Sequence, residues 1–332
     1  MTTMTRIERM TAVLRGEQPD RTPVSYWYHF PPECHCGPPA VQAHLKHLER
    51  HQLDFLKIMN DNGYPTRREV RSADDLGDLP VLRGDEDAYA SQLELIRSLA
   101  SELKGKVLMI TTLFNAWTLL RRVVTPRSSG TSRPPTLGGP VNPVDHRLSE
   151  LLVEDRGSVG MALDAIAASQ ANFAAKCIEA GADGIFLSVR DDWVDTEENG
   201  PDVYDQLVRT GDGQILSAAR GARFNMLHVC GVASNFDAFA AYPVHGINWA
   251  DRAAGPAISE VVGKVKSAVC GGVDNLGTLV KGSPPQVEEE VHDALRQAGN
   301  HPMIVAPGCT FDPQLVPEEN LDAMVKAVRA ST

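Results

Sequence analysis

The chain has 332 residues, a formal net charge of -11 and a pI of about 5.4. Hydrophobic residues make up 42% and charged residues 23% of it, which is typical of a globular protein with a substantial core. The acidic balance, without a dense Lys/Arg run, argues against a nucleic-acid partner. No apolar stretch reaches the roughly 18 residues of a membrane span, and the N-terminus lacks a signal-peptide pattern. We therefore expect a cytoplasmic protein with reduced cysteines and no membrane partner.

Short apolar runs alternate with helical patterns along the whole chain. Thr5, with Glu8 three residues on, predicts a capped N-terminal helix that ends near Leu14. Eight candidate strands follow: Thr22–His29, Phe55–Met59, Val107–Phe114, Gly184–Val189, Phe224–Cys230, Gly246–Ala250, Ala268–Asp274 and Met303–Cys309. Helical patterns lie between most of them, namely Val41–His51, Tyr89–Leu103, Gly157–Ala180, Pro201–Ala219, Ile258–Ser267, Gln286–Gln297 and Pro317–Ala330. This alternation predicts one (β/α)8 TIM barrel over residues 1–332, with an N-terminal helical extension.

One segment, at about 125–145, breaks the alternation. It is rich in Pro, Gly and Ser and follows the third predicted strand. A loop of this length within a compact domain is usually functional or disordered. We expect it to lie over the face formed by the carboxyl ends of the strands.

The candidate chemistry centres on His228, Cys230 and Cys309. Side chains alternate faces along a strand, so His228 and Cys230 point the same way at the carboxyl end of their strand. Cys309 closes the last predicted strand, and the carboxyl ends of barrel strands converge at the active-site face. One imidazole and two thiolates are typical zinc ligands, and three protein ligands leave one position open for catalysis. The pattern therefore predicts a catalytic zinc site.

The chain resembles the uroporphyrinogen decarboxylase superfamily, and within it the zinc-dependent, cobalamin-linked methyltransferase branch. The matching stretches are residues 16–24, 181–184, 228–231, 247–249, 271–274 and 308–309 followed by 317–320. The metal motif of that branch is His-x-Cys, a long spacer and Cys, which His228, Cys230 and Cys309 match. The resemblance implies that zinc activates a thiol such as coenzyme M, or another acceptor. It also implies a methyl donor such as methylcobalamin or a separate methylated corrinoid protein; relatives transfer methyl groups to tetrahydrofolate.

Other polar residues follow the predicted strands and are weaker candidates. We assign Asp61, Asp274 and Asn115 to catalysis, because a carboxylate or amide at the barrel mouth can orient a substrate or accept a proton. Asn248 and Asp191 are candidates for cofactor binding, with Asn248 holding a ligand or a loop in place. Asp61, Asp274 and water are alternatives for the fourth zinc ligand at rest. Cys34-His35-Cys36 is either a second soft-metal or redox element or a loop with chance cysteines.

Two other functions fit the same fold. A metal-free decarboxylase would need arginines near the N-terminus to bind the carboxylates of a porphyrinogen, but no arginine lies between Arg21 and Arg50. A non-catalytic barrel that binds a corrinoid or another ligand would not turn over any thiol. The sequence leaves the oligomeric state open, including a homodimer.

Overall fold

A computed structural model describes residues 3–65, 70–124, 143–190, 194–231 and 235–330. Its centre is a curled parallel sheet of seven strands that lie side by side in chain order. The strands are β1 (Phe55–Ile58), β2 (Leu108–Phe114), β3 (Gly184–Val189), β4 (Met226–Val229), β5 (Gly246–Trp249), β6 (Ala268–Val273) and β7 (Met303–Pro307). Parallel neighbours need a crossover connection, so the carboxyl ends of all seven strands meet at one edge.

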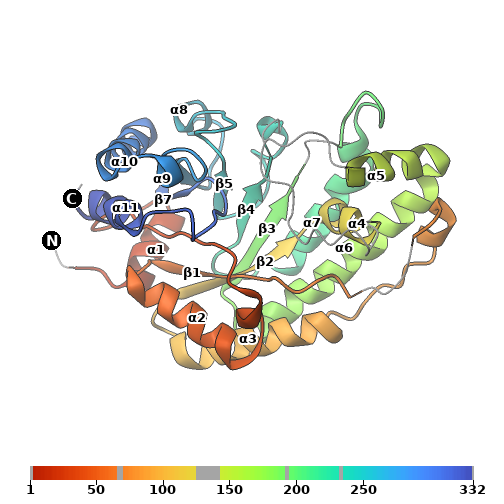
Figure 1. Ribbon diagram of the computed structural model, residues 1–332, viewed down its shortest axis with the longest axis horizontal. Helices are drawn as coiled ribbons and strands as arrows, with labels where there is room; N and C mark the ends of the chain where they lie inside the picture. Colours follow the sequence, from red (N-terminus) through yellow and green to blue (C-terminus); the bar gives the residue numbers. More distant parts are fainter. Residues whose placement is uncertain (1–2, 66–69, 125–142, 191–193, 232–234, 331–332) are drawn as a thin grey trace.

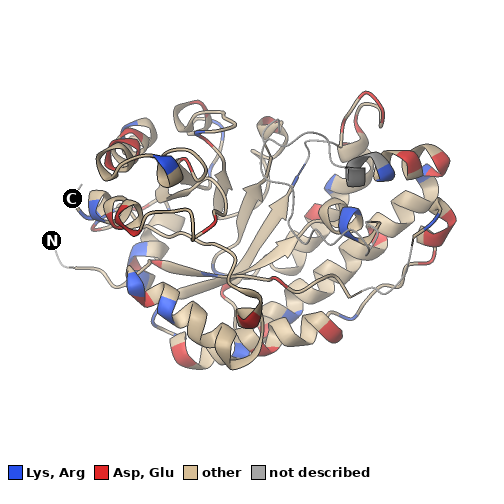
Figure 2. Ribbon diagram, viewed as in Figure 1, with Lys and Arg blue, Asp and Glu red and all other residues tan. Residues whose placement is uncertain are grey.

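Helices surround the sheet on its outer side (Figure 1). They are α1 (Arg6–Leu14), α2 (Gly37–Arg50), α3 (Asp87–Leu103), α4 (Ala116–Val123), α5 (Pro143–Glu154), α6 (Arg156–Glu179), α7 (Arg209–Ala218), α8 (Ile258–Val261), α9 (Thr278–Lys281), α10 (Pro284–Ala298) and α11 (Glu318–Ala330). The charged residues concentrate on these helices, while the strands are nearly free of charge (Figure 2). No helix in the described ranges is both long and apolar enough to span a membrane.

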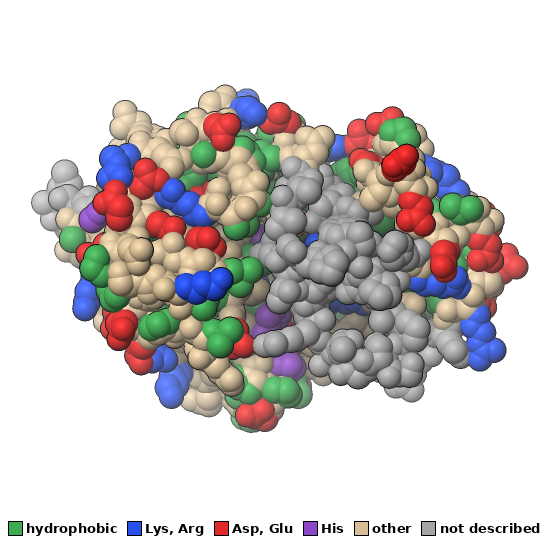
Figure 3. Space-filling view, turned by 45° about the horizontal axis from the view of Figure 1, so that its top comes forward, with side chains coloured by type: hydrophobic (Ala, Val, Ile, Leu, Met, Phe, Trp, Pro, Cys, Tyr) green, Lys and Arg blue, Asp and Glu red, His purple; other side chains and the backbone are tan. Residues whose placement is uncertain are grey.

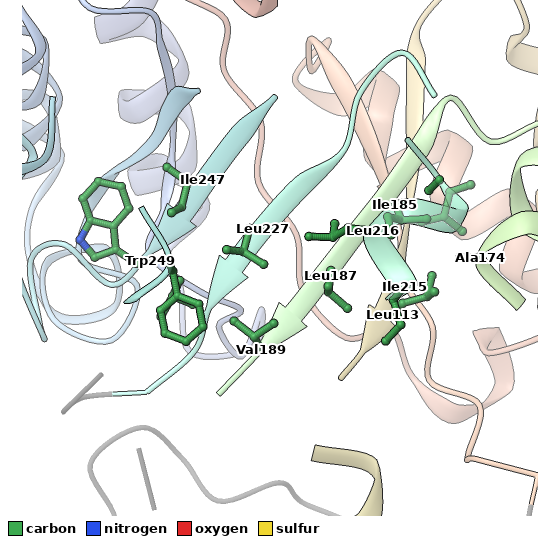
Figure 4. Packing of buried hydrophobic residues seen from close by; sticks show 14 of the residues in the cluster. Leu113, Ala174, Ile185, Leu187, Val189, Ile215, Leu216, Leu227, Ile247 and Trp249 are labelled. Carbon is green, nitrogen blue, oxygen red and sulfur yellow. The ribbon is translucent and has the colours of Figure 1, made fainter. Parts of the chain in front are cut away.

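The two faces of the sheet bury different residues. Alternate residues such as Ile185, Leu187 and Leu227 point outward and pack against α6 and α7 (Figure 4). The residues between them, such as Phe186 and Met226, belong to a separate apolar cluster on the inner side. The period of two therefore fixes which side chains of each strand can reach the interior.

The prediction of eight strands was wrong at Thr22–His29, which contributes only two isolated parallel bridges, Val24–Val305 and Tyr28–Phe311. This segment hydrogen-bonds to both edge strands of the sheet, β1 and β7. Side-chain groups, however, take the place of some of the backbone hydrogen bonds that a regular pair of strands would make. The Val24 amide donates to the Asp54 carboxylate (2.8 Å), and the Ser25 hydroxyl donates to the Phe55 carbonyl (2.9 Å). Pro23 has no amide to donate. The described residues therefore form a seven-stranded sheet and no regularly closed barrel.

Other differences lie in the connections. The helices α4 and α5 were not predicted, and α5 occupies residues 143–145 of the predicted long loop. Residues 125–142 of that loop lie outside the described ranges. The predicted helix Ile258–Ser267 is only the short α8, and Pro201–Ala219 is a π-helical turn, Tyr204–Val208, followed by α7. The N-terminal helix was predicted correctly, with the Thr5–Glu8 capping box in place.

Candidate metal centre

The carboxyl ends of β4 and β7 bring His228, Cys230 and Cys309 together. His228 lies in β4 and points inward, as Met226 does, and Cys230 follows the strand with the same orientation by alternation. The Cys230 amide donates to the Val189 carbonyl (2.9 Å), which continues the contact with β3. Cys309 comes two residues after β7, whose predicted end was two residues too late. The three residues therefore meet at the carboxyl edge of the sheet.

Gly308 allows Cys309 to reach this edge. A Cβ atom at position 308 would lie 2.6 Å from the Ala250 Cα atom, which is closer than a side chain can be accommodated. The Gly308 amide donates to the Val273 carbonyl (3.1 Å) and fixes the turn. A glycine at 308 is thus required for the chain to cross the end of β5 and present Cys309.

The donor atoms of the three residues lie close enough together to hold one metal ion. The imidazole nitrogen of His228 and the sulfurs of Cys230 and Cys309 all lie within 4.8 Å of one another. The Cys309 sulfur is 3.4 Å from the His228 Nε2 atom. Zinc with a Zn–S bond of about 2.3 Å and a Zn–N bond of about 2.0 Å would place these two atoms about 3.5 Å apart. The residues therefore fit zinc in both chemistry and separation.

Asn248 sets the tautomer of His228. Its side-chain oxygen accepts a hydrogen bond from His228 Nδ1 (2.6 Å), so the proton lies on Nδ1 and the Nε2 lone pair faces Cys309. The Asn248 amide nitrogen donates to the carbonyls of Cys270 (2.8 Å) and Pro307 (3.3 Å), which fixes its orientation. A carbonyl oxygen behind a ligating histidine is the usual way to orient it. These contacts place Asn248 behind His228, and its predicted part in cofactor binding stays a prediction.

The Cys309 thiol is set up to lose its proton. A hydrogen bond from Cys230 holds the pKa of Cys309 well below its ordinary value, and burial opposes this effect. The neighbouring His228 lowers it further. The thiolate is the form that ligates metals, so the low pKa favours metal binding near neutral pH.

Asp61 lies at the mouth of the sheet beside two histidines. His29 Nδ1 donates to its Oδ1 atom, and His35 Nε2 lies 3.8 Å from Oδ2 while bonded to the Phe30 carbonyl. Burial raises the pKa of Asp61, but the hydrogen bond and charge of His29 outweigh it, so the pKa lies below its ordinary value. Its carboxylate is not within the cluster of donor atoms formed by the described residues. Asp61 is therefore an anion at the mouth, paired with His29.

The Cys34-His35-Cys36 segment does not form a metal cluster among the described residues. Cys34 ends a short 3-10 helix, and Cys36 is exposed at the N-cap position of α2, where its side chain makes no capping hydrogen bond. His35 lies 3.8 Å from the predicted site residue Asp61, although its Nε2 atom is bonded to the Phe30 carbonyl.

The remaining predicted residues serve local structure or lie outside the described ranges. Asn115 is fully buried, accepts from the Thr118 amide (3.1 Å) as the N-cap of α4, and donates to Asp212 (3.5 Å). Asp274 Oδ1 accepts from the amides of Leu276 (3.0 Å) and Gly277 (2.9 Å) in a turn. Neither has an atom in the donor cluster. Asp191 lies outside the described residues.

Sequence reasoning missed His29 and Lys57. His29 was read as part of a strand, and Lys57 as an ordinary member of an apolar run. The signal for Lys57 was present, because it alternates with Phe55 and Met59 and so must point inward. On the face of the molecule shown in Figure 3, histidine side chains reach the surface near its centre.

The comparisons with known proteins identify the family. The family model for uroporphyrinogen decarboxylase (URO-D) matches residues 55–331, and the chain therefore belongs to this family. Comparison with curated protein sequences finds no match.

Solved structures show the same fold. A methyltransferase from Methanosarcina mazei has a TM-score of 0.76 and 18% identity, over 99% of each chain. A B12-independent methionine synthase from Shewanella sp. W3-18-1, in complex with selenomethionine, has a TM-score of 0.57 and 12% identity, over 94% of this chain and 98% of that chain. At such identities the likeness establishes the fold, and the chemistry has to be argued from the site.

Proposed function

We propose that this protein is a zinc-dependent methyltransferase that moves a methyl group, supplied by a methylated corrinoid, to a thiol or similar acceptor. The observation that carries the proposal is the His228, Cys230 and Cys309 donor set, with the Nε2 lone pair turned toward the sulfurs. Family membership alone does not separate a decarboxylase from a methyltransferase. The donor set separates them, because a metal-free decarboxylase has no need for it.

The named functions of the structural neighbours agree with this choice. One is named a methyltransferase and another a B12-independent methionine synthase; the first name supports methyl transfer, and neither name supports the corrinoid donor. Their low identity means that these names only support an argument made from the site. We also propose that residues 22–29, which bond to both edge strands, take the place of the eighth strand and complete the barrel.

The chain's own residues perform distinct tasks in this proposal. Zinc bound to the donor set would lower the pKa of an acceptor thiol and keep it nucleophilic near neutral pH. Asn248 holds the imidazole of His228 so that Nε2, rather than Nδ1, faces the metal position. Phe186 packs against the His228 ring at a centroid distance of 5.3 Å and keeps water from that side. We propose that Asp61, with His29, orients the acceptor at the mouth.

A direct assay tests the function. Zinc-loaded protein is mixed with methylcobalamin and, in turn, 2-mercaptoethanesulfonate, homocysteine and tetrahydrofolate, and the loss of methylcobalamin absorbance is recorded. We expect turnover with at least one acceptor, loss of turnover in Cys309→Ala, and wild-type turnover in Cys36→Ala, whose thiol is exposed and outside the donor set. Zinc binding without transfer to any acceptor would refute the transfer reaction and leave the metal site intact.

A further inference from the structure

Lys57 places a charged group inside the sheet. It lies in β1, alternates with Phe55 and Met59, and is only 3% exposed. Both of those neighbours belong to the apolar cluster on the inner side of the sheet. Lysine almost never occupies such a position unless its ammonium group is paired.

The contacts of the ammonium group leave it without an oxygen partner. Of the residues that the structure describes, only the Met59 sulfur accepts a hydrogen bond from Nζ (3.3 Å). Nζ also lies 4.3 Å from the centre of the Phe186 ring and 5.5 Å from that of Trp27. Cation–π contacts stabilise a buried ammonium group by less than the desolvation of its charge costs. The rings thus offset only part of the cost, and the remainder calls for an anion.

The anionic groups near Lys57 are those of the candidate site. Burial lowers the pKa of Lys57 to about 7, while charges on Cys309, Asp61 and Cys230 act to raise it. The Phe186 ring that carries the ammonium group also stacks on the His228 ring. Lys57 therefore borders the inner side of the donor set, and Asp61 is already paired with His29.

We propose that Lys57 is a positioning residue that offsets the negative charge which the acceptor thiolate brings to the centre, an inference that rests on the proposed function. Zinc and the two cysteine thiolates sum to zero charge. An acceptor thiolate brings the sum to minus one in a low-dielectric site, and the ammonium group of Lys57 restores neutrality. Lys57 thereby favours the anionic form of the acceptor over its thiol without contacting the reacting atoms.

Acceptor binding can be measured apart from turnover. Cobalt(II) replaces zinc in the stripped protein, and 2-mercaptoethanol is titrated while the visible absorption of the metal is followed at several pH values. The variants are Lys57→Met, which is neutral and of similar length, Lys57→Gln, and Lys57→Arg, which retains the charge. The matched control is Lys264→Met, which removes an exposed lysine that pairs with Asp237.

We expect the neutral variants to bind 2-mercaptoethanol about tenfold more weakly and the pH midpoint of binding to rise by about one unit, because one pKa unit corresponds to a tenfold change. Lys57→Arg should restore most of the affinity, and Lys264→Met should match the wild type.

Each outcome separates this inference from the proposed function. A purely structural lysine would change the melting temperature of the stripped protein and leave the pH midpoint of both neutral variants at the wild-type value, which would overturn the inference alone. Failure of the wild-type protein to bind cobalt or zinc would overturn the proposed function as well.

Discussion

Two buried charges three residues apart in the chain, Asp54 and Lys57, have opposite surroundings. Asp54 precedes β1 and is fully buried, and its carboxylate accepts from Arg9 (2.8 Å), Arg21 (2.7 Å) and the Val24 amide (2.8 Å). For Lys57, near the other end of β1, the described part of the chain places only a sulfur and aromatic rings beside the ammonium group. Asp54 at the amino end of the strand is thus paired with opposite charges, whereas the described residues give Lys57 toward the carboxyl end no such ion pair.

This contrast agrees with a rule known from (β/α)8 barrels. There, residues at the amino ends of the strands contribute to stability, and residues at the carboxyl ends form the active site. At the amino end, the two arginines and Asp54 join α1, the 22–29 segment and β1 into one network. At the carboxyl end, the thiols, Lys57 and Asp61 remain arranged for a ligand. Variants at the two ends should therefore separate stability from metal binding.

The largest effect should follow from Asp54→Asn. The change removes the carboxylate that pairs with Arg21 and one of the two carboxylates that pair with Arg9. We therefore expect a loss of about 3–5 kcal/mol in the free energy of unfolding, as for other broken buried ion pairs. Urea denaturation measures this loss. The zinc content of the folded variant should equal that of the wild type.

Asp237→Asn is the matched control, because Asp237 is exposed and its ion pair in the described structure is with Lys264. Its stability should change by less than about 1 kcal/mol. If Asp54→Asn were as stable as this control, or if it lost zinc while folded, the division between the two ends would be wrong.

The next largest effect should be a loss of folding stability in acid, caused by the buried His44 behind β1. His44 is buried, donates from Nδ1 to the Ala40 carbonyl (2.7 Å) and accepts the Met59 amide at Nε2 (3.1 Å), so it has to be neutral. Burial lowers the pKa of His44 to about 4. Between pH 6.5 and 4 the unfolded chain binds a proton there that the folded chain does not, so stability falls as the pH falls through this range.

The shift of about 2.5 units corresponds to about 3 kcal/mol. Urea denaturation at pH 7 and pH 5 should show a smaller pH dependence in His44→Gln than in the wild type. An equal pH dependence in both proteins would show that His44 is not held neutral.

The smallest effect concerns Asn248 at the carboxyl end. Asn248→Ala removes the acceptor that orients His228, and we expect the zinc dissociation constant to rise about 10- to 100-fold, as for other partners of ligating histidines. Competition with a chromophoric chelator measures it. Unchanged affinity would mean that the imidazole is held by its stacking on Phe186 alone.

The sequence predicted the parts of this arrangement that depend on alternation. The shared orientation of His228 and Cys230 follows from the period of two, and the position of Cys309 follows from its place after the last strand. These residues do lie together in the structure. Seven of the eight predicted strands are also present, with ends displaced by up to two residues.

The parts that failed depend on side-chain contacts between distant segments. Residues 22–29 have the composition of a strand, but the Val24 amide donates its hydrogen bond to the Asp54 carboxylate and not to the backbone of a neighbouring strand. The catalytic role of Asn115 stays a prediction, since the structure shows only that its side chain caps α4 and bonds to Asp212. No local pattern distinguishes a polar residue that caps a helix from one that faces a substrate.

The most direct test of the central claim is the zinc content of protein purified without added metal, for the wild type, Cys309→Ala and Cys177→Ala. Cys177 is a fully buried thiol in α6, outside the donor set, and controls for the loss of a buried sulfur. We predict about one zinc ion per chain in the wild type and in Cys177→Ala, and almost none in Cys309→Ala, because a site with three protein ligands cannot spare a thiolate. Zinc absent from the wild type, or retained in Cys309→Ala, would contradict the assignment of this site.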